Sequence, residues 1–540
     1  MNILKSSIKI SALVIASCMY SSCDSLDLKP LDNYGSTSYW TKPEHIVGYM
    51  DGLHQNLRDK SFQHTMTFGE VRGGTSLIGN AVDGTSINDE ALKTQALSQV
   101  STGVSKFGEL YGLLANINIF LQNTKAATYM TDTEKAFYLG QAYGLRAFHY
   151  FDLYRLYGTV PLRLDPNPVV NGNFNPEDLY MGRASGTAVM AQIKSDLEES
   201  LKYFGDNNSF DPKNRGNKKS YWSKAATEML LGEVYLWNAK VSVDDNAASA
   251  ADLTIAKQHL LSVINSYGLS LQKKFSDVFS TSNKGNNELI MVIRYLQGEA
   301  TNSYNNFCYN YQTGQFKTIG FYDAEGNALG DALNVGTTGM QRHEYKPELY
   351  LSYNSADMRR DQTFLAAYNK TGKLMGTVMR KIMGHFDTAK NLYVWDADAV
   401  IYRLPMAYLM LAEIANMEDD KTNVEYYINL VRERAYGDNW SKEEYGYKAS
   451  DFTTNELAIL HERDKEFVGE GQRWWDVCRM TLTKGGKHLV FCPEASYATT
   501  EPILSEKEAY KVYWPIEVEM INKDPKLEQT PGYIEAEEEK

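Results

Sequence analysis

Residues 132–157 read DTEKAFYLGQAYGLRAFHYFDLYRLY and predict a long helix that is apolar on most of its sides. Thr131 and Glu134 form a capping box, in which each side chain satisfies a backbone amide that the helix start leaves unpaired. Gly158 follows at the C-terminal cap position, and Pro161 blocks continuation. Glycines and alanines alternate with aromatic rings, so a neighbouring helix can approach closely while the rings fill the gaps. We therefore expect this helix to be deeply buried in a mostly helical protein.

Two further blocks show the same mixture of small and aromatic residues. Residues 221–239 read YWSKAATEMLLGEVYLWNA, and residues 402–417 read YRLPMAYLMLAEIANM. The second block is followed by TNVEYYINLVRERAYG at 422–437, in which Thr422 and Glu425 predict another capping box and the final glycine ends the helix. Two helices of this length with a short turn have the size of a tetratricopeptide unit. The pattern favours a scaffold of tetratricopeptide-like helical hairpins.

Between the helical blocks the composition changes. Residues 60–90 and 270–400 are rich in Gly, Asn, Ser and Thr, and ELIMVIRY at 288–295 reads as a strand. Long loops on a rigid scaffold are where binding sites usually lie. We predict a helical scaffold mainly over 44–60, 88–270 and 400–480, and an irregular, partly β ligand-binding lobe mainly over 61–87 and 271–399.

The amino-terminal segment is typical of export. Lys5 and Lys9 precede a short apolar stretch that ends at Met19, and small residues then lead to Cys23. The stretch is too short to remain as a membrane span. A cysteine at this junction is typical of a bacterial lipobox, although Tyr20 replaces the usual leucine; ordinary secretion is the alternative. We predict a lipoprotein signal peptide over 1–22, acylation of Cys23, a tether over 23–38 and a single domain over 39–540.

Charge and motif content exclude several classes of function. The net charge is −13 and no long basic run occurs, which argues against a nucleic-acid partner. Beyond the signal region three cysteines remain, Cys308, Cys478 and Cys492, an odd set that favours neither a disulfide framework nor a zinc site. His343–Glu344 lacks the second histidine of a zinc protease, and no phosphate loop or nucleophile elbow is present. We expect no cofactor, no metal and no catalytic residue.

Four segments, taken in order, resemble the SusD/RagB family. The run LRAFHYFDLYRLYGTVPL at 145–162 is similar to the family's buried helix and its following turn. ILHERDKEFVGEGQRWWDVCR at 459–479 and VYWPIEVEMINKDPKLEQTPGY at 512–533 are similar to its carboxy-terminal motifs, and SYWTKPEHIVGYMDGLHQNLR at 38–58 also fits. The departures from the family pattern lie in the last motif, at Glu517, Asp524 and Thr530.

The resemblance implies a function as well as a fold. Members of this family are lipid-anchored on the outer face of the outer membrane, where they capture oligosaccharide and deliver it to a SusC-like TonB-dependent transporter without catalysis. The same role with peptide cargo, as in RagB-type members, is the first alternative. A surface-anchored glycoside hydrolase is the less favoured one, because it requires two carboxylates placed on either side of a sugar.

Aromatic rings beside polar side chains are the candidates for ligand contact, since a sugar ring stacks on an aromatic face while its hydroxyls need polar partners. One source is the stretch 295–316, although its alternating rings also fit one buried strand face. Another is the glycine-rich stretch 69–84. The candidate ligand-binding residues are Arg72, Asn80, Asp83, Tyr304, Tyr309, Tyr311 and Trp395.

The motif HERDKEFVGEGQRWWDVCR carries many charges in a short space. Glu462, Arg463 and Glu466 fall within one helical turn, where opposite charges support each other. Arg473 and Asp476 are predicted to pair at the start of the next helix, with the two adjacent tryptophans anchored in the core. We interpret these residues as a structural salt-bridge lattice rather than an acid–base site.

Overall fold

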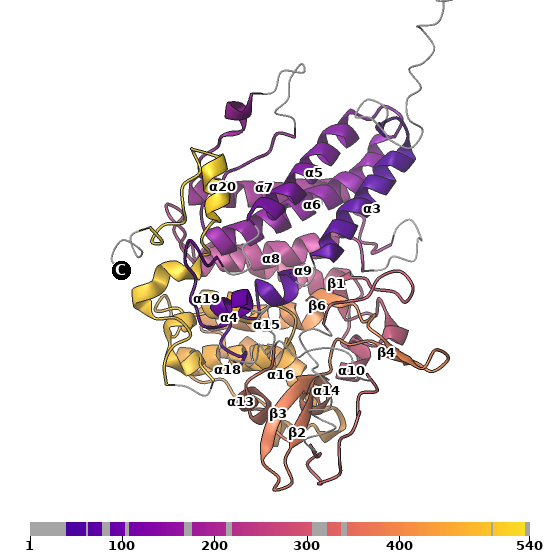
Figure 1. Ribbon diagram of the computed structural model, residues 1–540, viewed down its shortest axis with the longest axis vertical. Helices are drawn as coiled ribbons and strands as arrows, with labels where there is room; N and C mark the ends of the chain where they lie inside the picture. Colours follow the sequence, from indigo (N-terminus) through magenta and orange to yellow (C-terminus); the bar gives the residue numbers. More distant parts are fainter. Residues whose placement is uncertain are drawn as a thin grey trace, which may run out of the picture.

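The computed structural model describes residues 39–60, 63–77, 87–102, 107–166, 175–211, 219–304, 321–335, 343–497 and 500–534. The predicted fold is confirmed: the protein is mostly helical with a few short strands (Figure 1). The scaffold helices are α3 (Pro43–Asp59), α4 (Ile87–Lys93), α5 (Phe107–Ala126), α6 (Asp132–Tyr157), α7 (Gly186–Phe204), α8 (Lys224–Lys240), α9 (Asp252–Ser266), α15 (Leu404–Met417), α16 (Lys421–Tyr436), α17 (Lys442–Tyr445), α18 (Phe452–Glu466), α19 (Arg473–Arg479) and α20 (Val518–Lys523).

The lobe between α9 and α15 contains short helices and all the strands of the described residues. Its helices are α10 (Phe275–Val278), α13 (Pro347–Leu351) and α14 (Arg359–Thr363). Its strands are β1 (Leu289–Ile293), β2 (Phe364–Tyr368), β3 (Leu374–Met379), β4 (His385–Asp387), β5 (Leu392–Val394) and β6 (Ala399–Arg403). The strands pair as three two-stranded antiparallel sheets, β1–β6, β2–β3 and β4–β5.

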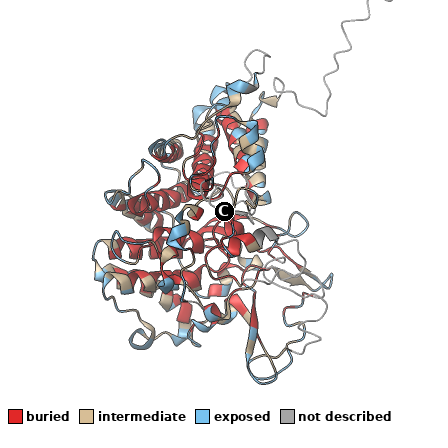
Figure 2. Ribbon diagram, turned by 60° about the vertical axis from the view of Figure 1, so that its left-hand side comes forward, coloured by how far each residue is buried: buried red, intermediate tan, exposed pale blue. Residues whose placement is uncertain are grey.

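Helix α6 lies at the centre of the scaffold and has the predicted bounds. The amide of Glu134 donates to Oγ1 of Thr131 at 3.3 Å, and the amide of Thr131 donates to Oε2 of Glu134 at 2.9 Å, which completes the capping box. Gly158 ends the helix with a φ of 71°, a conformation that favours glycine. Every residue from Tyr138 to Tyr157 is buried (Figure 2).

Small residues allow close packing at the predicted places. A Cβ added to Gly144 of α6 would lie 2.0 Å from Nε1 of Trp222, and one added to Gly232 of α8 would lie 2.5 Å from a methyl of Leu260 in α9. The segment that leads into α8 therefore approaches α6, and helix α9 approaches α8, more closely than a Cβ atom at these positions would permit. Consecutive helices pack as the pairs α6–α7, α8–α9 and α15–α16, and α15 also contacts α9 and α18.

Two predicted helix starts are corrected by the structure. The block 402–417 begins as the end of β6, and α15 starts only at Leu404, because Arg403 still pairs with β1. Helix α16 is capped by Asp420, whose Oδ1 accepts from the amide of Asn423 at 3.1 Å. The predicted capping box is absent because the Glu425 side chain instead accepts from the amide of Ala449 at 2.9 Å.

The predicted strand over 288–295 is confirmed as β1, and its pairing with β6 brings the two ends of the lobe together. Leu289 lies opposite Arg403 and Ile293 lies opposite Ala399 in the antiparallel β1–β6 pair. All residues of both strands are buried. The chain therefore leaves and re-enters the helical scaffold at adjacent strands.

The charged motif of α18 is confirmed as a buried structural lattice, but its partners differ from those predicted. Asp476 accepts from Arg463 at 2.7 Å, and Arg473 pairs with Asp464 at 2.8 Å, so the predicted Arg473–Asp476 pair is wrong. Glu466 lies between arginines of three other elements, with Arg359 at 2.9 Å and Arg403 and Arg434 also in contact. The charges join elements across the fold, because buried ions need partners on every side.

The remaining sequence predictions concern cysteines and membrane spans. Cys478 and Cys492 are buried free thiols, whereas Cys308 lies outside the described residues. Trp474 and Trp475 are buried in the core as predicted. Within the described part of the chain, no helix combines the length and the apolarity that crossing a bilayer requires.

Candidate binding groove

Helix α3 presents one apolar and one open face. Its apolar face packs into the core through Ile46, Met50, Leu53 and Leu57. Its other face carries Gly48, Asp51, Gly52, Gln55 and Arg58, which recur at helical spacing and line a groove.

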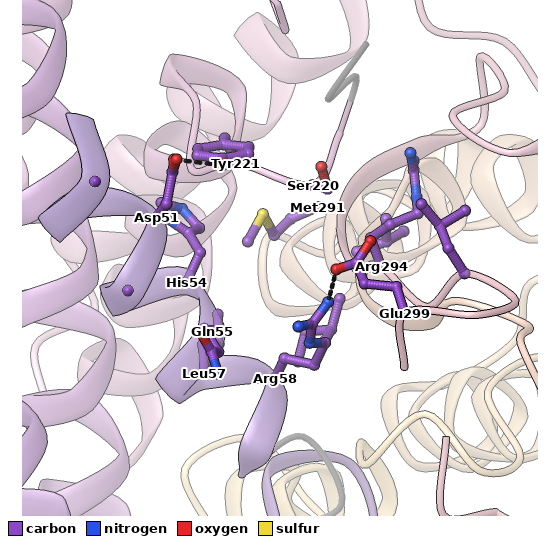
Figure 3. A pocket seen from close by; sticks show the side chains of 15 residues that line it. Asp51, His54, Gln55, Leu57, Arg58, Ser220, Tyr221, Met291, Arg294 and Glu299 are labelled. Carbon is purple, nitrogen blue, oxygen red and sulfur yellow. Dashed lines mark hydrogen bonds and ion pairs between the residues drawn. The ribbon is translucent and has the colours of Figure 1, made fainter. Parts of the chain in front are cut away.

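The groove lies between α3 and the start of the lobe, and its volume is about 540 Å³ (Figure 3). The wall facing α3 is formed by Ser220 and Tyr221, by β1 as far as Arg294, and by the turn from Leu296 to Glu299. This volume falls in the range of small-molecule and oligosaccharide sites, about 300–1,000 Å³. We call this cavity the α3 groove.

Three side chains make a rigid wall in the α3 groove. Tyr221 donates its hydroxyl to Oδ1 of Asp51 at 2.6 Å, and the Tyr221 and His54 rings are 4.4 Å apart (Figure 3). Nδ1 of His54 donates to the carbonyl of Met50 at 3.0 Å, and Nε2 accepts from the amide of Trp222 at 3.0 Å. These two bonds require the neutral Nδ1–H tautomer and engage both ring nitrogens.

Charged side chains of both signs surround the mouth of the α3 groove. Arg58, near the end of α3, pairs with Glu299 of the opposite turn at 2.5 Å, and both side chains are solvent-accessible (Figure 3). On the inner side Arg294 pairs with Asp398 at 3.0 Å. The groove therefore offers guanidinium donors, carboxylate acceptors and one aromatic ring within a single cavity.

Glycines keep the floor of the groove open. A Cβ added to Gly52 would meet no atom within 4 Å, and one added to Gly48 would meet only the hydroxyl of Tyr39, at 3.9 Å. Glycine in a helix costs about 0.5–1 kcal/mol relative to alanine. No packing constraint among the described residues requires glycine at Gly52, so its open space belongs to the groove.

The structure gives Arg72 a framework role. The side chain has no exposed surface, and its guanidinium donates twice to Oε1 of Gln95, at 2.9 and 2.7 Å. It also stacks on Trp474 at 4.0 Å from the ring centre. Burial lowers the pKa of Arg72 to about 10. Arg72 therefore has no surface to offer a ligand.

Tyr304 and Trp395 lie close together in the lobe but are largely buried. Tyr304 is 1% exposed and donates its hydroxyl to Oγ1 of Thr65 at 2.7 Å. Trp395 is 9% exposed and packs in a small apolar cluster whose partly buried edge is Tyr393. The carbonyl of Trp395 accepts from the amide of Asn302 at 2.7 Å, which joins the two segments.

The other predicted contacts, Asn80, Asp83, Tyr309 and Tyr311, lie outside the described residues, as does Cys23. The sequence reasoning missed the α3 groove altogether. A signal was present, because two glycines four residues apart on the polar face of an amphipathic helix, Gly48 and Gly52, are unfavourable without a reason.

The protein is therefore a scaffold of helical hairpins that carries a loop-rich lobe and an open polar groove. Two family models match this chain. A family model described as the SusD family matches residues 353–533, and one described as "starch-binding associating with outer membrane" matches residues 24–230. The chain belongs to the SusD family.

Solved structures show the same relationship. A SusD superfamily protein from Bacteroides fragilis is 53% identical, with a TM-score of 0.85 over 92% of this chain and 100% of that one. B. fragilis NanU is 29% identical, with a TM-score of 0.77 over 94% of this chain and 100% of that one. Surface glycan-binding protein A from Bacteroides thetaiotaomicron, solved with laminarihexaose, shares the fold at 18% identity, with a TM-score of 0.68 over 91% and 100%.

Proposed function

We propose that this protein binds oligosaccharide at the cell surface and delivers it to a SusC-like TonB-dependent transporter, without catalysing a reaction. Family membership supports the role, and a surface glycan-binding protein of the same fold is solved in complex with laminarihexaose. Acylation of Cys23 would hold the protein on the outer membrane, facing the exterior.

The α3 groove is the observation that carries the proposal. A sugar presents apolar C–H faces, for which the Tyr221 ring is a flat partner, and hydroxyls that need both donors and acceptors. Asp51 and Glu299 supply acceptors, and Arg58 supplies donors. Because the groove is open and bounded on two sides by regular structure, it can accept a chain end without rearrangement of the core.

The groove's polar groups are arranged for recognition rather than for proton transfer. Both nitrogens of His54 are engaged by backbone groups, so the ring is held as part of the wall. Asp51 accepts from Tyr221, and Glu299 is paired with Arg58. General acid–base catalysis needs a group that reaches the reacting atom with a proton to give or take. We therefore assign these groups to hydroxyl contacts.

Filling the groove tests the proposal. Gly52→Phe places a ring in the open space of the groove, whereas Gly112→Phe places one on the exposed face of α5, where a Cβ also meets no atom within 4 Å. The soluble chain starting at Asp24 and both variants are run through affinity gels containing a panel of polysaccharides. We expect one polysaccharide class to retard the wild type and Gly112→Phe but not Gly52→Phe.

Three other results would place the binding site elsewhere or change the ligand. Equal retardation of all three proteins would exclude the α3 groove as the site. Loss of retardation in an added variant, Trp395→Ala, but not in Gly52→Phe would move the site to the lobe around Trp395. Retardation by no glycan, together with binding of a peptide library, would establish the alternative peptide cargo.

A further inference from the structure

Three buried side chains that can bind a metal ion lie close together where η1 packs against α6. His149 and Asp152 lie three residues apart on one face of α6. His64 reaches them from η1 (Gln63–Thr67), a single π-helical turn that follows α3 in the chain. One nitrogen of each histidine and one carboxylate oxygen all lie within 4.8 Å of one another. His64, His149 and Asp152 are 8%, 3% and 3% exposed.

The polar atoms of this cluster lack hydrogen-bond partners within the part of the chain that the structure describes. The unpartnered atoms are both nitrogens of His64, Nδ1 of His149 and Oδ2 of Asp152. Oδ2 of Asp152 lies 2.7 Å from Nδ1 of His64, which is an ion-pair distance, so Nε2 of His64 and Nδ1 of His149 are the atoms left with no contact of either kind. A buried polar atom without a partner costs about 1–3 kcal/mol, so a ligand that pairs with these atoms would stabilise the folded state.

The surroundings orient the cluster. Arg155 donates to Oδ1 of Asp152 at 2.8 Å and to Glu233 at 2.5 Å, which leaves Oδ2 directed at the histidines. Partners of this kind fix the orientation of metal ligands in known sites. The Phe148 ring lies 5.3 Å from the His64 ring and excludes water from one side. A cavity of about 30 Å³, the volume of one water molecule, adjoins His64 and Asp152.

We propose that His64, His149 and Asp152 bind a divalent transition-metal ion, for which Zn²⁺ is the best match. Two imidazoles and one carboxylate are a ligand set that Zn²⁺ takes in tetrahedral geometry, with a water molecule in the adjoining cavity as the fourth ligand. Asp152, Glu233 and Arg155 together leave one negative charge, which attracts a cation to the site.

The burial of the site makes this a structural ion. It fastens η1 to α6, so it braces the segment that follows the groove helix α3. Because the ligands lie outside the α3 groove, this proposal does not depend on the proposed glycan binding.

Metal titration tests it. The untagged chain from Asp24 is stripped with a chelator, and Zn²⁺ binding is measured by competition with a chromophoric chelator, together with the shift in melting temperature. The binding is repeated with Co²⁺, whose visible absorption reports tetrahedral coordination. His64→Gln and Asp152→Asn remove ligands, and His259→Gln, on α9, is the control. We expect one equivalent of Zn²⁺ to bind and raise the melting temperature, with affinity at least about tenfold weaker in the ligand variants only.

Two results would overturn the proposal. One is that the wild type binds no Zn²⁺ and shows no Co²⁺ absorption, in which case the cavity holds only water. The other is that all three variants bind Zn²⁺ as tightly as the wild type. The Co²⁺ spectrum of the wild type decides the matter even if His64→Gln fails to fold.

Discussion

Glu70 is a carboxylic acid enclosed by the core. Its Oε1 accepts from the hydroxyl of Tyr345 at 3.0 Å and from the amide of Gly469 at 3.2 Å, while Oε2 has no partner among the described residues. Burial raises the pKa of Glu70 to about 7, since these bonds only partly offset the loss of solvent. The folded state therefore holds the proton more tightly than the unfolded chain.

The raised pKa of Glu70 makes the folded state less stable as pH rises. Glu70 favours the folded state most below its unfolded pKa of about 4.5, and this contribution is lost as pH rises through about 7. Glu70→Gln keeps an acceptor at Oε1 and removes the titration. We expect the free energy of unfolding of the wild type, relative to Glu70→Gln, to fall by roughly 3 kcal/mol between pH 5 and 8. Urea unfolding at both pH values measures this difference, and parallel profiles would contradict the assignment.

The carboxylates near Glu466 have lowered pKa values, so their effect on stability changes with pH in the opposite direction to that of Glu70. Arg434, Arg403 and Arg359 hold the pKa of Glu466 far below its usual range, against the effect of burial. Arg359 and Arg432 likewise lower the pKa of Glu462 to about 2. The stability from these carboxylates is present above their unfolded pKa and is lost as pH falls from about 4.5 toward 2.

At the scale of the element, glycines of two helices have opposite roles. Gly144 of α6 has no room for a methyl group, because Trp222 lies against it, whereas Gly52 of α3 faces open space. We expect Gly144→Ala to lower the free energy of unfolding by about 1–3 kcal/mol through overpacking. We expect Gly52→Ala to raise it by about 0.5–1 kcal/mol, since helix propensity improves and nothing clashes. Denaturant midpoints compare the two variants, and a stabilising Gly144→Ala would contradict the packing seen around α6.

Helix α6 and strand β1 could be predicted because their signals lie within a few residues of each element. Thr131, Glu134 and Gly158 mark the two ends of helix α6, and a run of apolar, mostly β-branched residues indicates β1. The start of α16 could not be assigned in the same way, because Asp420 and Thr422 are both acceptable caps. Only the contact of Glu425 with Ala449, a residue of a later loop, decides between them.

The candidate sites were harder to predict, because they combine residues far apart in the chain. Arg463 has suitable partners at helical spacing, yet its partner in the fold is Asp476 of another helix. The α3 groove depends on Tyr221 and Glu299 facing α3, and the histidine cluster on His64 reaching α6. Sequence spacing carries none of these distances, so the sequence alone predicts no metal site.

At the scale of the whole molecule, acylation of Cys23 is predicted to attach the protein to the outer membrane. If Cys23 is acylated, its acyl chains contribute roughly 0.8 kcal/mol for each buried methylene group and hold the protein to the membrane. We expect Cys23→Ser to abolish palmitate labelling and to release the protein from the outer-membrane fraction. Cys18→Ser, within the same signal segment, is the control and should leave both unchanged. Retention of the Cys23→Ser protein in the membrane would mean that another contact anchors it.

The β1–β6 pair has a consequence for how such proteins diversify. Leu289 and Arg403 are opposite one another, so the segment between β1 and β6 begins and ends at two adjacent, buried strands. A segment with neighbouring ends can be exchanged between related genes as a cassette if the recipient supplies the same strand pair and partners for the buried charges of the segment. Here Arg359 of the lobe pairs with Glu466 of α18, so a replacement lobe has to keep an arginine at that place.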